Sequence, residues 1–389
     1  MRRMKHALIA LGALPVVLTA CSGTTQAALS VPESIGDAEY ALYFSAPSTE
    51  LDQENQYGKV VLVDADGSLS AIPTLGMDYG AMAWTEKALV FSDMRNDYLL
   101  DQSGLQSIPS EKTDSQYAML ATGPESVVGI YNFGFSDEGG YGTQIVTTTG
   151  GESSLNEVEG GYYVTANCGG KIFGAGRATG RYSKTGDPET EPVMFNQITG
   201  TPDGKEKQVG LNEKARDNAI VPDAPCVDGK VYYISDSVGG GLEDPMKPVL
   251  SIWDTDTGKY TEVPMRADVL GKPLMSHEDA GYPQMTAESI RDGKLEWFGV
   301  GNSIMSTDLT TGATKKKFEV AGYTDDSVRS RAIFHGDEVV QLVEPYDDGK
   351  YEIVRYDRRT GQELGRTTID DDVADVHGGL FLRGFALKP

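Results

Sequence analysis

Hydrophobic and polar positions alternate over short stretches of this chain, and turns rich in Asp, Thr and Gly separate the stretches. Residues 251–265 (SIWDTDTGKYTEVPM) show the pattern most fully, with an apolar run, an Asp/Thr/Gly turn and a second alternating run. Alternation with a period of two predicts β-strands, and a tight turn between two such runs predicts a hairpin. Beyond the N-terminal segment, no useful length of sequence has helical spacing of apolar residues. The sequence therefore predicts an all-β protein.

Turns of this type recur along the chain at intervals of 37 to 58 residues. They end at Gly67, Gly104, Gly150, Gly200, Gly258, Gly312 and Gly361. Most follow an earlier hairpin, such as Asp228-Gly229-Lys230 before VYYIS, so each unit reads as four strands, which we call A to D. The recurring turn joins strands C and D. Radial repetition of such units predicts a seven-bladed β-propeller of four-stranded antiparallel blades, as a single domain over residues 38–389.

The repeat resembles that of the bacterial seven-bladed propellers of the YncE-like and quinoprotein-like group, whose units read DGKxxYV…VxxxDxxTGK. The resemblance covers roughly residues 38–387. It implies the fold but no function, because propellers host many functions. Quinoprotein propellers carry a Trp after the Asp-x-x-Thr-Gly-Lys motif, whereas this chain has Tyr260 and Val263 after Lys259. We therefore expect no quinone and no other cofactor.

The two ends of the chain predict how the ring closes. Residues 39–45, 59–64 and 69–75 look like the later strands of one blade, and residues 376–385 look like the start of another unit. We expect these segments to complete one shared blade. How many strands each end contributes stays open.

The N-terminus resembles a bacterial lipoprotein signal. A basic start (MRRMKH) precedes an apolar core of residues 7–18, and Leu18-Thr19-Ala20-Cys21 fits the lipobox. The apolar core is too short to span a bilayer as a stable helix. The resemblance implies a signal peptide over residues 1–20 and lipidation of Cys21, which would anchor the protein to the cell membrane on its extracytoplasmic side. The alternative is an ordinary secretory peptide with a chance cysteine. Residues 21–37 are small and polar and predict a flexible tether.

Composition and net charge limit the classes of partner that the protein can bind. The formal net charge is −24, and removal of the signal peptide would make it more negative. Such a surface repels nucleic acid phosphates and anionic lipid headgroups, so we expect no nucleic acid partner. A hydrophobic content of 39% with 46 glycines suits a folded, turn-rich β protein.

Two cysteines remain besides Cys21. Cys168 and Cys226 lie shortly before Lys171 and Lys230, at the predicted A–B turns of consecutive blades. Outside the cytoplasm this placement is compatible with a disulfide. Two buried free thiols are the alternative.

Unequal loops between strands B and C indicate a binding face. Long loops span 46–58, 132–142, 177–192 and 236–248, and three of them belong to consecutive blades. Long loops on a rigid scaffold often carry recognition residues, although neutral drift in loop length would look the same. The candidate binding residues are Phe133, Phe135, Tyr141, Arg177, Arg181, Tyr182, Lys184 and Asp244.

Signals for catalysis and metal binding are weak. The polar candidates for an axial channel are His277, Glu278 and His335, and their spacing fits no zinc motif. No G-x-S-x-G nucleophile elbow is present. The pair Asp254/Asp256 resembles half of a calcium loop, but its repeat position predicts turn residues whose carboxylates accept backbone N–H bonds. We expect no metal site.

The leading hypothesis is a lipid-anchored extracytoplasmic propeller that binds a protein, a small molecule or a glycan, or acts as a scaffold. The alternative is an enzyme of the lyase or glycan-cleaving type that uses carboxylate and His chemistry in the axial channel. A third hypothesis is a sensory accessory subunit of a membrane complex.

Overall fold

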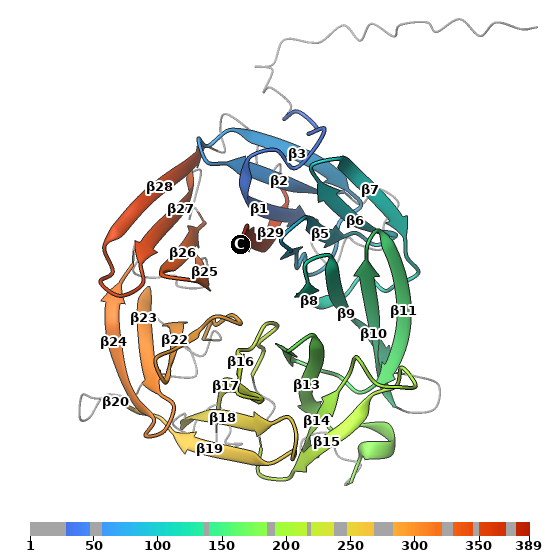
Figure 1. The fold of residues 1–389 in the computed structure, drawn as a ribbon, viewed down its shortest axis with the longest axis vertical. Coiled ribbons are helices and arrows are strands. Elements are labelled where there is room, and N and C mark those ends of the chain that lie inside the picture. Colours follow the sequence, from blue (N-terminus) through green and yellow to red (C-terminus); the bar gives the residue numbers. More distant parts are fainter. Residues whose placement is uncertain are drawn as a thin grey trace, which may run out of the picture.

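Strands of the chain form seven sheets arranged radially around a central axis (Figure 1). The computed structural model describes residues 29–46, 57–135, 140–184, 191–215, 219–236, 247–267, 283–299, 301–320, 330–344, 350–370 and 379–389. Within these ranges the fold is a seven-bladed β-propeller, as predicted, with the short 3-10 helix η2 (Gly180–Tyr182). No helix in this part of the chain is long and apolar enough to cross a membrane.

Each blade has four antiparallel strands in sequence order, apart from the closing blade. Blade 1 combines β29 (Phe381–Leu387), β1 (Ala38–Ser45), β2 (Gly58–Asp64) and β3 (Leu69–Thr74). Blade 2 contains β4 (Ala83–Trp84), β5 (Leu89–Ser92), β6 (Asn96–Asp101) and β7 (Gly104–Pro109). Blade 3 contains β8 (Gln116–Gly123), β9 (Ser126–Phe135), β10 (Tyr141–Thr149) and β11 (Glu152–Glu159). Blade 4 contains β12 (Val164–Cys168), β13 (Lys171–Arg177), β14 (Val193–Gln197) and β15 (Lys207–Asn212).

The remaining blades follow the same plan. Blade 5 contains β16 (Cys226–Val227), β17 (Lys230–Asp236), β18 (Pro248–Asp254) and β19 (Tyr260–Pro264). Blade 6 contains β21 (Ile290–Arg291), β22 (Lys294–Gly299), β23 (Ser303–Asp308) and β24 (Ala313–Glu319), and β20 (Arg266–Ala267) adds a short parallel strand at its edge. Blade 7 contains β25 (Ser330–His335), β26 (Glu338–Val343), β27 (Lys350–Asp357) and β28 (Glu363–Asp370).

Burial follows the position of a strand in its blade. The second strand β17 is buried at every residue after its first, whereas the outermost strand β19 has no buried residue. An inner strand is covered on both faces by neighbouring blades, so it reads as the continuous apolar run VYYIS. An outer strand meets solvent, so it reads as an alternating run.

The recurring turns between the third and fourth strands have a common chemistry. Asp254 accepts hydrogen bonds from the backbone N–H and the hydroxyl of Thr257, both at 2.8 Å, and Asp308 and Asp357 repeat this arrangement. These bonds favour the ionised carboxylate and lower the pKa of Asp254. The prediction that the carboxylate of Asp254 accepts a backbone N–H bond within a turn is therefore confirmed.

A glycine ends each of these turns, and Gly258 shows two physical reasons for it. Its φ is +67°, which is strained for residues with a Cβ, and an added Cβ would overlap the carbonyl of Val209 on the outer strand of the preceding blade. The turn of one blade thus rests directly on the outer strand of the blade before it. A neighbouring aromatic contact reinforces this packing, because Trp253 stacks on Phe195 of blade 4 with ring centroids 5.1 Å apart.

Blade 1 closes the ring with strands from both ends of the chain. The C-terminal strand β29 pairs antiparallel with β1 and occupies the innermost position, while the N-terminal residues supply the other three strands. The shared blade was predicted, and the structure adds that the C-terminal end contributes one strand and the N-terminal end three.

The described part of the expected tether packs against the propeller. Ile35 is buried and donates its N–H to the carbonyl of Asp101 in blade 2, and Ser30 accepts the N–H of Ala71 in β3. The ordered contacts therefore begin before residue 38, where the domain was expected to start. Cys21 and the rest of the expected signal and tether lie outside the described residues.

Candidate functional site

Aromatic side chains form a connected patch at blades 3 and 4, where the long loops were predicted to bind a ligand. The ring of Phe135 meets that of Tyr141 edge to face at 5.1 Å, and the hydroxyls of Tyr141 and Tyr117 lie 3.2 Å apart. Tyr117 then contacts the ring of Tyr163 at 5.5 Å. Phe135 is 80% exposed and ends the patch in solvent. We call Phe135, Tyr141, Tyr117 and Tyr163 the aromatic patch.

Two of these residues were not predicted from the sequence, and one predicted residue lies elsewhere. Tyr117 lies in the innermost strand of blade 3, and Tyr163 directly precedes that of blade 4, so both fall outside the B–C loops that contain the predicted residues. Phe133 is 42% exposed, and its ring covers the face of the strand to which a side chain at Gly142 would point. By strand alternation this face is opposite to the one that carries the side chain of Tyr141. Phe133 therefore belongs to the other face of the hairpin.

Arg181 and Tyr182 hold blades 3 and 4 together. Arg181 forms ion pairs with Glu159 at the end of β11 and with Glu206 just before β15. Tyr182 donates its hydroxyl proton to Glu206 at 3.0 Å and lies 4.8 Å from the guanidinium of Arg181. Because these contacts involve Glu159 of blade 3 and Glu206 of blade 4, the main role of Arg181 and Tyr182 is to connect the two blades.

The other predicted loop residues are less informative. Arg177 ends β13 and has an interaction partner, and the backbone N–H of Lys184 donates to Glu191 at 2.6 Å. Asp244, His277 and Glu278 lie outside the described residues.

His335 is the one predicted channel residue that the structure describes. It ends the innermost strand of blade 7, is 40% exposed, and its Nδ1 lies 3.0 Å from Glu288. Glu288 also accepts the backbone N–H of Gly336 at 2.7 Å. The pair therefore lies at the turn between the first two strands of blade 7.

Cys168 and Cys226 form a disulfide between the innermost strands of blades 4 and 5, with Cα atoms 5.5 Å apart. Of the two alternatives that the sequence left open, the structure contains the bond.

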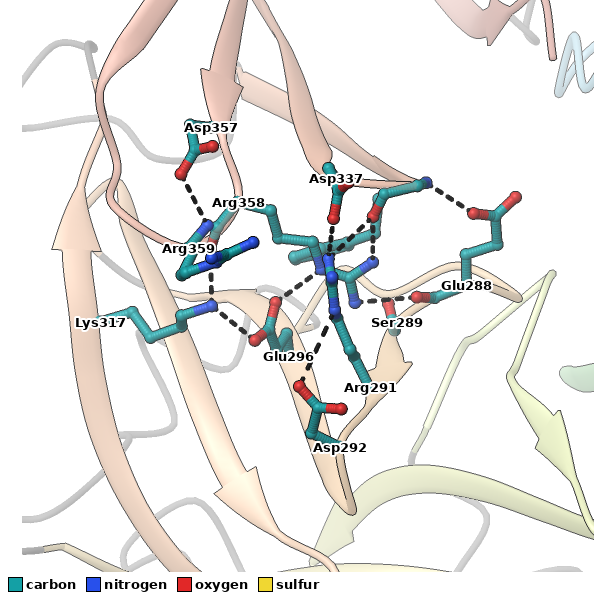
Figure 2. Close-up of polar contacts among 12 residues, drawn as sticks. Glu288, Ser289, Arg291, Asp292, Glu296, Lys317, Asp337, Asp357, Arg358 and Arg359 are labelled. Carbon is teal, nitrogen blue, oxygen red and sulfur yellow. Dashed lines mark hydrogen bonds and ion pairs between the residues drawn. The ribbon is translucent and has the colours of Figure 1, made fainter.

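A buried carboxylate lies between blades 6 and 7 (Figure 2). Glu296 of β22 accepts a hydrogen bond from Lys317 of β24 at 2.6 Å and one from Nε of Arg358 at 2.7 Å. Arg358 belongs to the turn after β27, so this triad joins two strands of blade 6 to blade 7. The guanidinium of Arg358 also donates to the carbonyls of Glu288 and Gly336 and lies over the ring of Phe334.

A groove opens above this triad. It consists of one hollow of ≈ 440 Å³ and two of ≈ 330 Å³, and all three have Arg291 in their walls. Arg291 pairs with Asp337 at 2.5 Å across the two blades. The outer end of the groove is lined by Lys294, Ser306, Lys315, Lys316 and Arg359. We call this the blade 6–7 groove.

Sequence reasoning did not single out this groove, although its signal was visible. Residues 315–317 are three successive lysines, and residues 358–359 are the pair of arginines in a C–D turn, both in a chain of net charge −24. Lys317 and Arg358 lie 41 residues apart in sequence, and the two groups of cations come together only because blades 6 and 7 are neighbours in the ring.

No group of three or more His, Cys, Asp or Glu residues capable of holding a metal ion occurs in the described ranges. The cationic lining of the blade 6–7 groove is likewise unsuited to a cation, because like charges repel.

Comparisons with known proteins agree with the fold. Residues 33–172 match the family model of the YycP β-propeller domain. A search of curated proteins gave no match.

Solved structures give the same picture. The β-propeller domain of the Trilobed protease from Pyrococcus furiosus aligns with a TM-score of 0.52 at 13% identity, over 89% of this chain and 99% of that one. The acylaminoacyl peptidase of Pyrococcus horikoshii aligns with a TM-score of 0.52 at 12% identity, over 89% of this chain and 53% of that one. A quinoprotein alcohol dehydrogenase-like protein from Bacteroides thetaiotaomicron aligns with a TM-score of 0.45 at 10% identity, over 94% and 97%. At such identities the likeness concerns the propeller fold alone.

Proposed function

We propose that this protein is a lipid-anchored, extracytoplasmic binding module, and that its ligand docks on the aromatic patch. The propeller fold is compatible with a binding or scaffold role. The observation that carries the proposal is the exposure of Phe135 at the end of a connected row of aromatic rings. Rigid aromatic side chains supply large contact area at low entropic cost, and they are enriched where proteins bind partners.

The patch is held in place before a ligand arrives. The ring of Tyr141 packs over Gly161, and its hydroxyl meets that of Tyr117. Burial raises the pKa of the Tyr117 phenol, so this hydroxyl stays protonated at neutral pH and can donate a hydrogen bond. A fixed aromatic surface with a polar tip suits a protein side chain or the apolar face of a sugar.

The lipid anchor rests on the sequence Leu18-Thr19-Ala20-Cys21. Expression of the full chain in a bacterium should give a protein that partitions into detergent and carries an acylated Cys21 in mass spectrometry. The Cys21→Ser variant should lose both properties. A wild-type protein without acyl chains would contradict the anchor while leaving the binding proposal open.

Binding is tested by placing a photo-crosslinking phenylalanine analogue at Phe135 in producing cells. The matched control places it at Leu364, which is also an exposed apolar residue but lies on the outer strand of blade 7. We expect a discrete adduct from position 135, absent from position 364 and reduced by Tyr141→Ser. Protease and glycosidase treatment of the adduct distinguishes a protein from a glycan. Equal adducts at both positions, or no effect of Tyr141→Ser, would refute the proposal.

The enzyme hypothesis gains no comparable support. Its one described channel residue, His335, is half-exposed and bonded to the exposed Glu288. Solvent screening at such a position weakens the electrostatic control that acid–base catalysis needs.

A further inference from the structure

The blade 6–7 groove concentrates positive charge on an otherwise acidic protein. Its lining includes the cations Arg291, Lys294, Lys315, Lys316, Lys317 and Arg359. The acids in the lining are Glu288 and Asp337 at the inner end and Asp292 and Glu296 farther out. The lining thus carries more basic than acidic side chains, whereas the whole chain has a net charge of −24.

Internal ion pairs use only part of this positive charge. Glu296 pairs with both Lys317 and Arg358 in the floor, Arg291 pairs with Asp337, and Lys316 pairs with Glu319.

Three further cations line the groove without such partners. Lys294, Lys315 and Arg359 are exposed, and among the described residues their side chains form no hydrogen bond or ion pair. Lys294 faces Asp308 across its strand pair, and its charge is only a minor cause of the lowered pKa of that carboxyl. Three cations are thus available to a ligand.

Equivalent positions in neighbouring blades show that the repeat does not require these cations. The third residue of the turn is Arg359 in blade 7, but Asp256 in blade 5 and Thr310 in blade 6. Three residues after the turn glycine, blade 6 has Lys315 where blade 5 has Thr261. The ladder between β23 and β24 shifts register between Ile304 and Met305, as do the equivalent ladders of blades 4 and 7, whereas that of blade 5 is regular. Such bulges redirect side chains, and this one lies where Lys317 turns toward the floor.

The lining of the groove limits the class of anion. Its hollows adjoin from the inner turn at Glu288 to the outer strand at Lys315, and the available cations Lys294, Lys315 and Arg359 all line the outer hollow. Asp292 lines the same hollow, while Asp337 and Glu319 are paired with Arg291 and Lys316. A broad anionic surface such as a bilayer would meet these acids together, whereas the phosphate groups of one chain can pair with the three cations separately.

From this lining we infer that the blade 6–7 groove binds a polyanion that carries several phosphate groups along one chain. Arg359 presents a planar fork that suits phosphate oxygens, and Lys294 and Lys315 add point charges in the same hollow. The buried Glu296 triad fixes the floor, so the groove needs no rearrangement on binding. This site is independent of the aromatic patch, which lies on blades 3 and 4.

The test uses the purified full chain in a nonionic detergent, with sodium polyphosphate as the probe and inorganic phosphate as the monomeric comparison. Isothermal titration calorimetry at low salt should show binding of the polymer, much weaker binding of the monomer, and loss of affinity as salt rises. In the variant Lys294→Gln/Lys315→Gln/Arg359→Gln, we expect the affinity to fall by about tenfold or more.

The matched control is Lys171→Gln/Lys230→Gln/Lys259→Gln, which removes the same charge from exposed positions of blades 4 and 5. It should change the affinity by less than about threefold, because these cations lie outside the groove. Thermal unfolding of both variants checks that the fold is retained. Equal losses in the two variants, or no binding to wild type, would overturn the inference. Vesicles of phosphatidylglycerol that bind as well as polyphosphate, with the same dependence on the groove residues, would also overturn it in favour of a membrane surface.

Discussion

Blades 3 and 4 meet through the same kind of junction as blades 6 and 7, but with the charges reversed. At the first junction one arginine, Arg181, holds the two carboxylates Glu159 and Glu206. At the second, two cations hold one carboxylate, Glu296. In both places a residue of the outer strand of one blade meets the segment between the third and fourth strands of the next. The backbone N–H of Glu159 donates to Glu206, and Lys317 donates to the carbonyl of Arg358.

Burial separates the two junctions further. The side chain of Arg181 is 52% exposed, whereas that of Arg358 is 3% exposed. An exposed clasp gains little from its charges, because solvent screens them. A buried triad is costly to desolvate and costly to break, so it fixes the geometry of the surface around it. The comparison indicates that the blade 6–7 junction is a rigid base for a charged groove, and that the blade 3–4 junction mainly supports an aromatic surface.

Removing Arg358 should have the largest effect on stability. The Arg358→Met variant leaves Glu296 buried with only Lys317 as a partner, and breaking a buried pair typically costs about 3–5 kcal/mol. Urea unfolding followed by tryptophan fluorescence measures this change.

The control is Arg359→Met in the same turn, whose exposed side chain makes no ion pair in the described structure. It should change the free energy of unfolding by less than about 0.5 kcal/mol. If both variants behaved alike, the triad would not be the structural base that the comparison requires.

Removing the disulfide tests how much a covalent link between blades 4 and 5 stabilises the part of the ring that lies between the two junctions. The bond joins blades 4 and 5 across 58 residues of sequence, so its loss should lower the free energy of unfolding by about 2–4 kcal/mol. Cys168→Ser/Cys226→Ser should match the reduced wild type, and a reducing agent should not affect the variant further. Equal stability of the oxidised and reduced wild type would refute this role.

The fold was predictable because its signals are local and repeated. The turn at Gly258 and its counterparts specify hairpins wherever they occur, and seven repetitions specify a ring. Blade closure followed from an incomplete unit at residues 376–385. The disulfide stayed open because the distance between neighbouring inner strands is a tertiary quantity that the repeat alone does not supply.

The candidate sites were only partly predictable, because they depend on contacts between blades. Phe135 and Tyr141 lie on one hairpin, so loop length revealed them, but Tyr163 enters the patch from the next blade. Lys315 and Arg359 come from two blades and meet only through the ring. A repeat aligned position by position would have shown both cations as departures from their counterparts, and that comparison is the signal that was missed.

Arg181 should matter less than Arg358, despite its similar position. In Arg181→Ala the hydroxyl of Tyr182 still donates to Glu206, and the lost ion pairs are partly screened. We expect a loss of about 1 kcal/mol or less in urea unfolding. A loss as large as that of Arg358→Met would show that exposure does not distinguish the junctions.

The smallest effect concerns acid. In blade 7 the carboxylate of Asp357 accepts hydrogen bonds from the hydroxyl and backbone N–H of Thr360 and from the backbone N–H of Arg359. These bonds, above all the one from the Thr360 hydroxyl, hold the pKa of Asp357 below the ordinary value of 3.8. Its stabilising effect is therefore complete above that value and is lost as pH falls through the lowered pKa. Blade 4 has Asn196 at the matching position, so its turn has no such carboxylate. Hydrogen-exchange protection of the Thr360 amide should fall in acid relative to the blade 4 turn, and Asp357→Asn should remove this pH dependence. An unchanged pH dependence in Asp357→Asn would mean that the acid response arises elsewhere, and the two turns would then differ only in sequence.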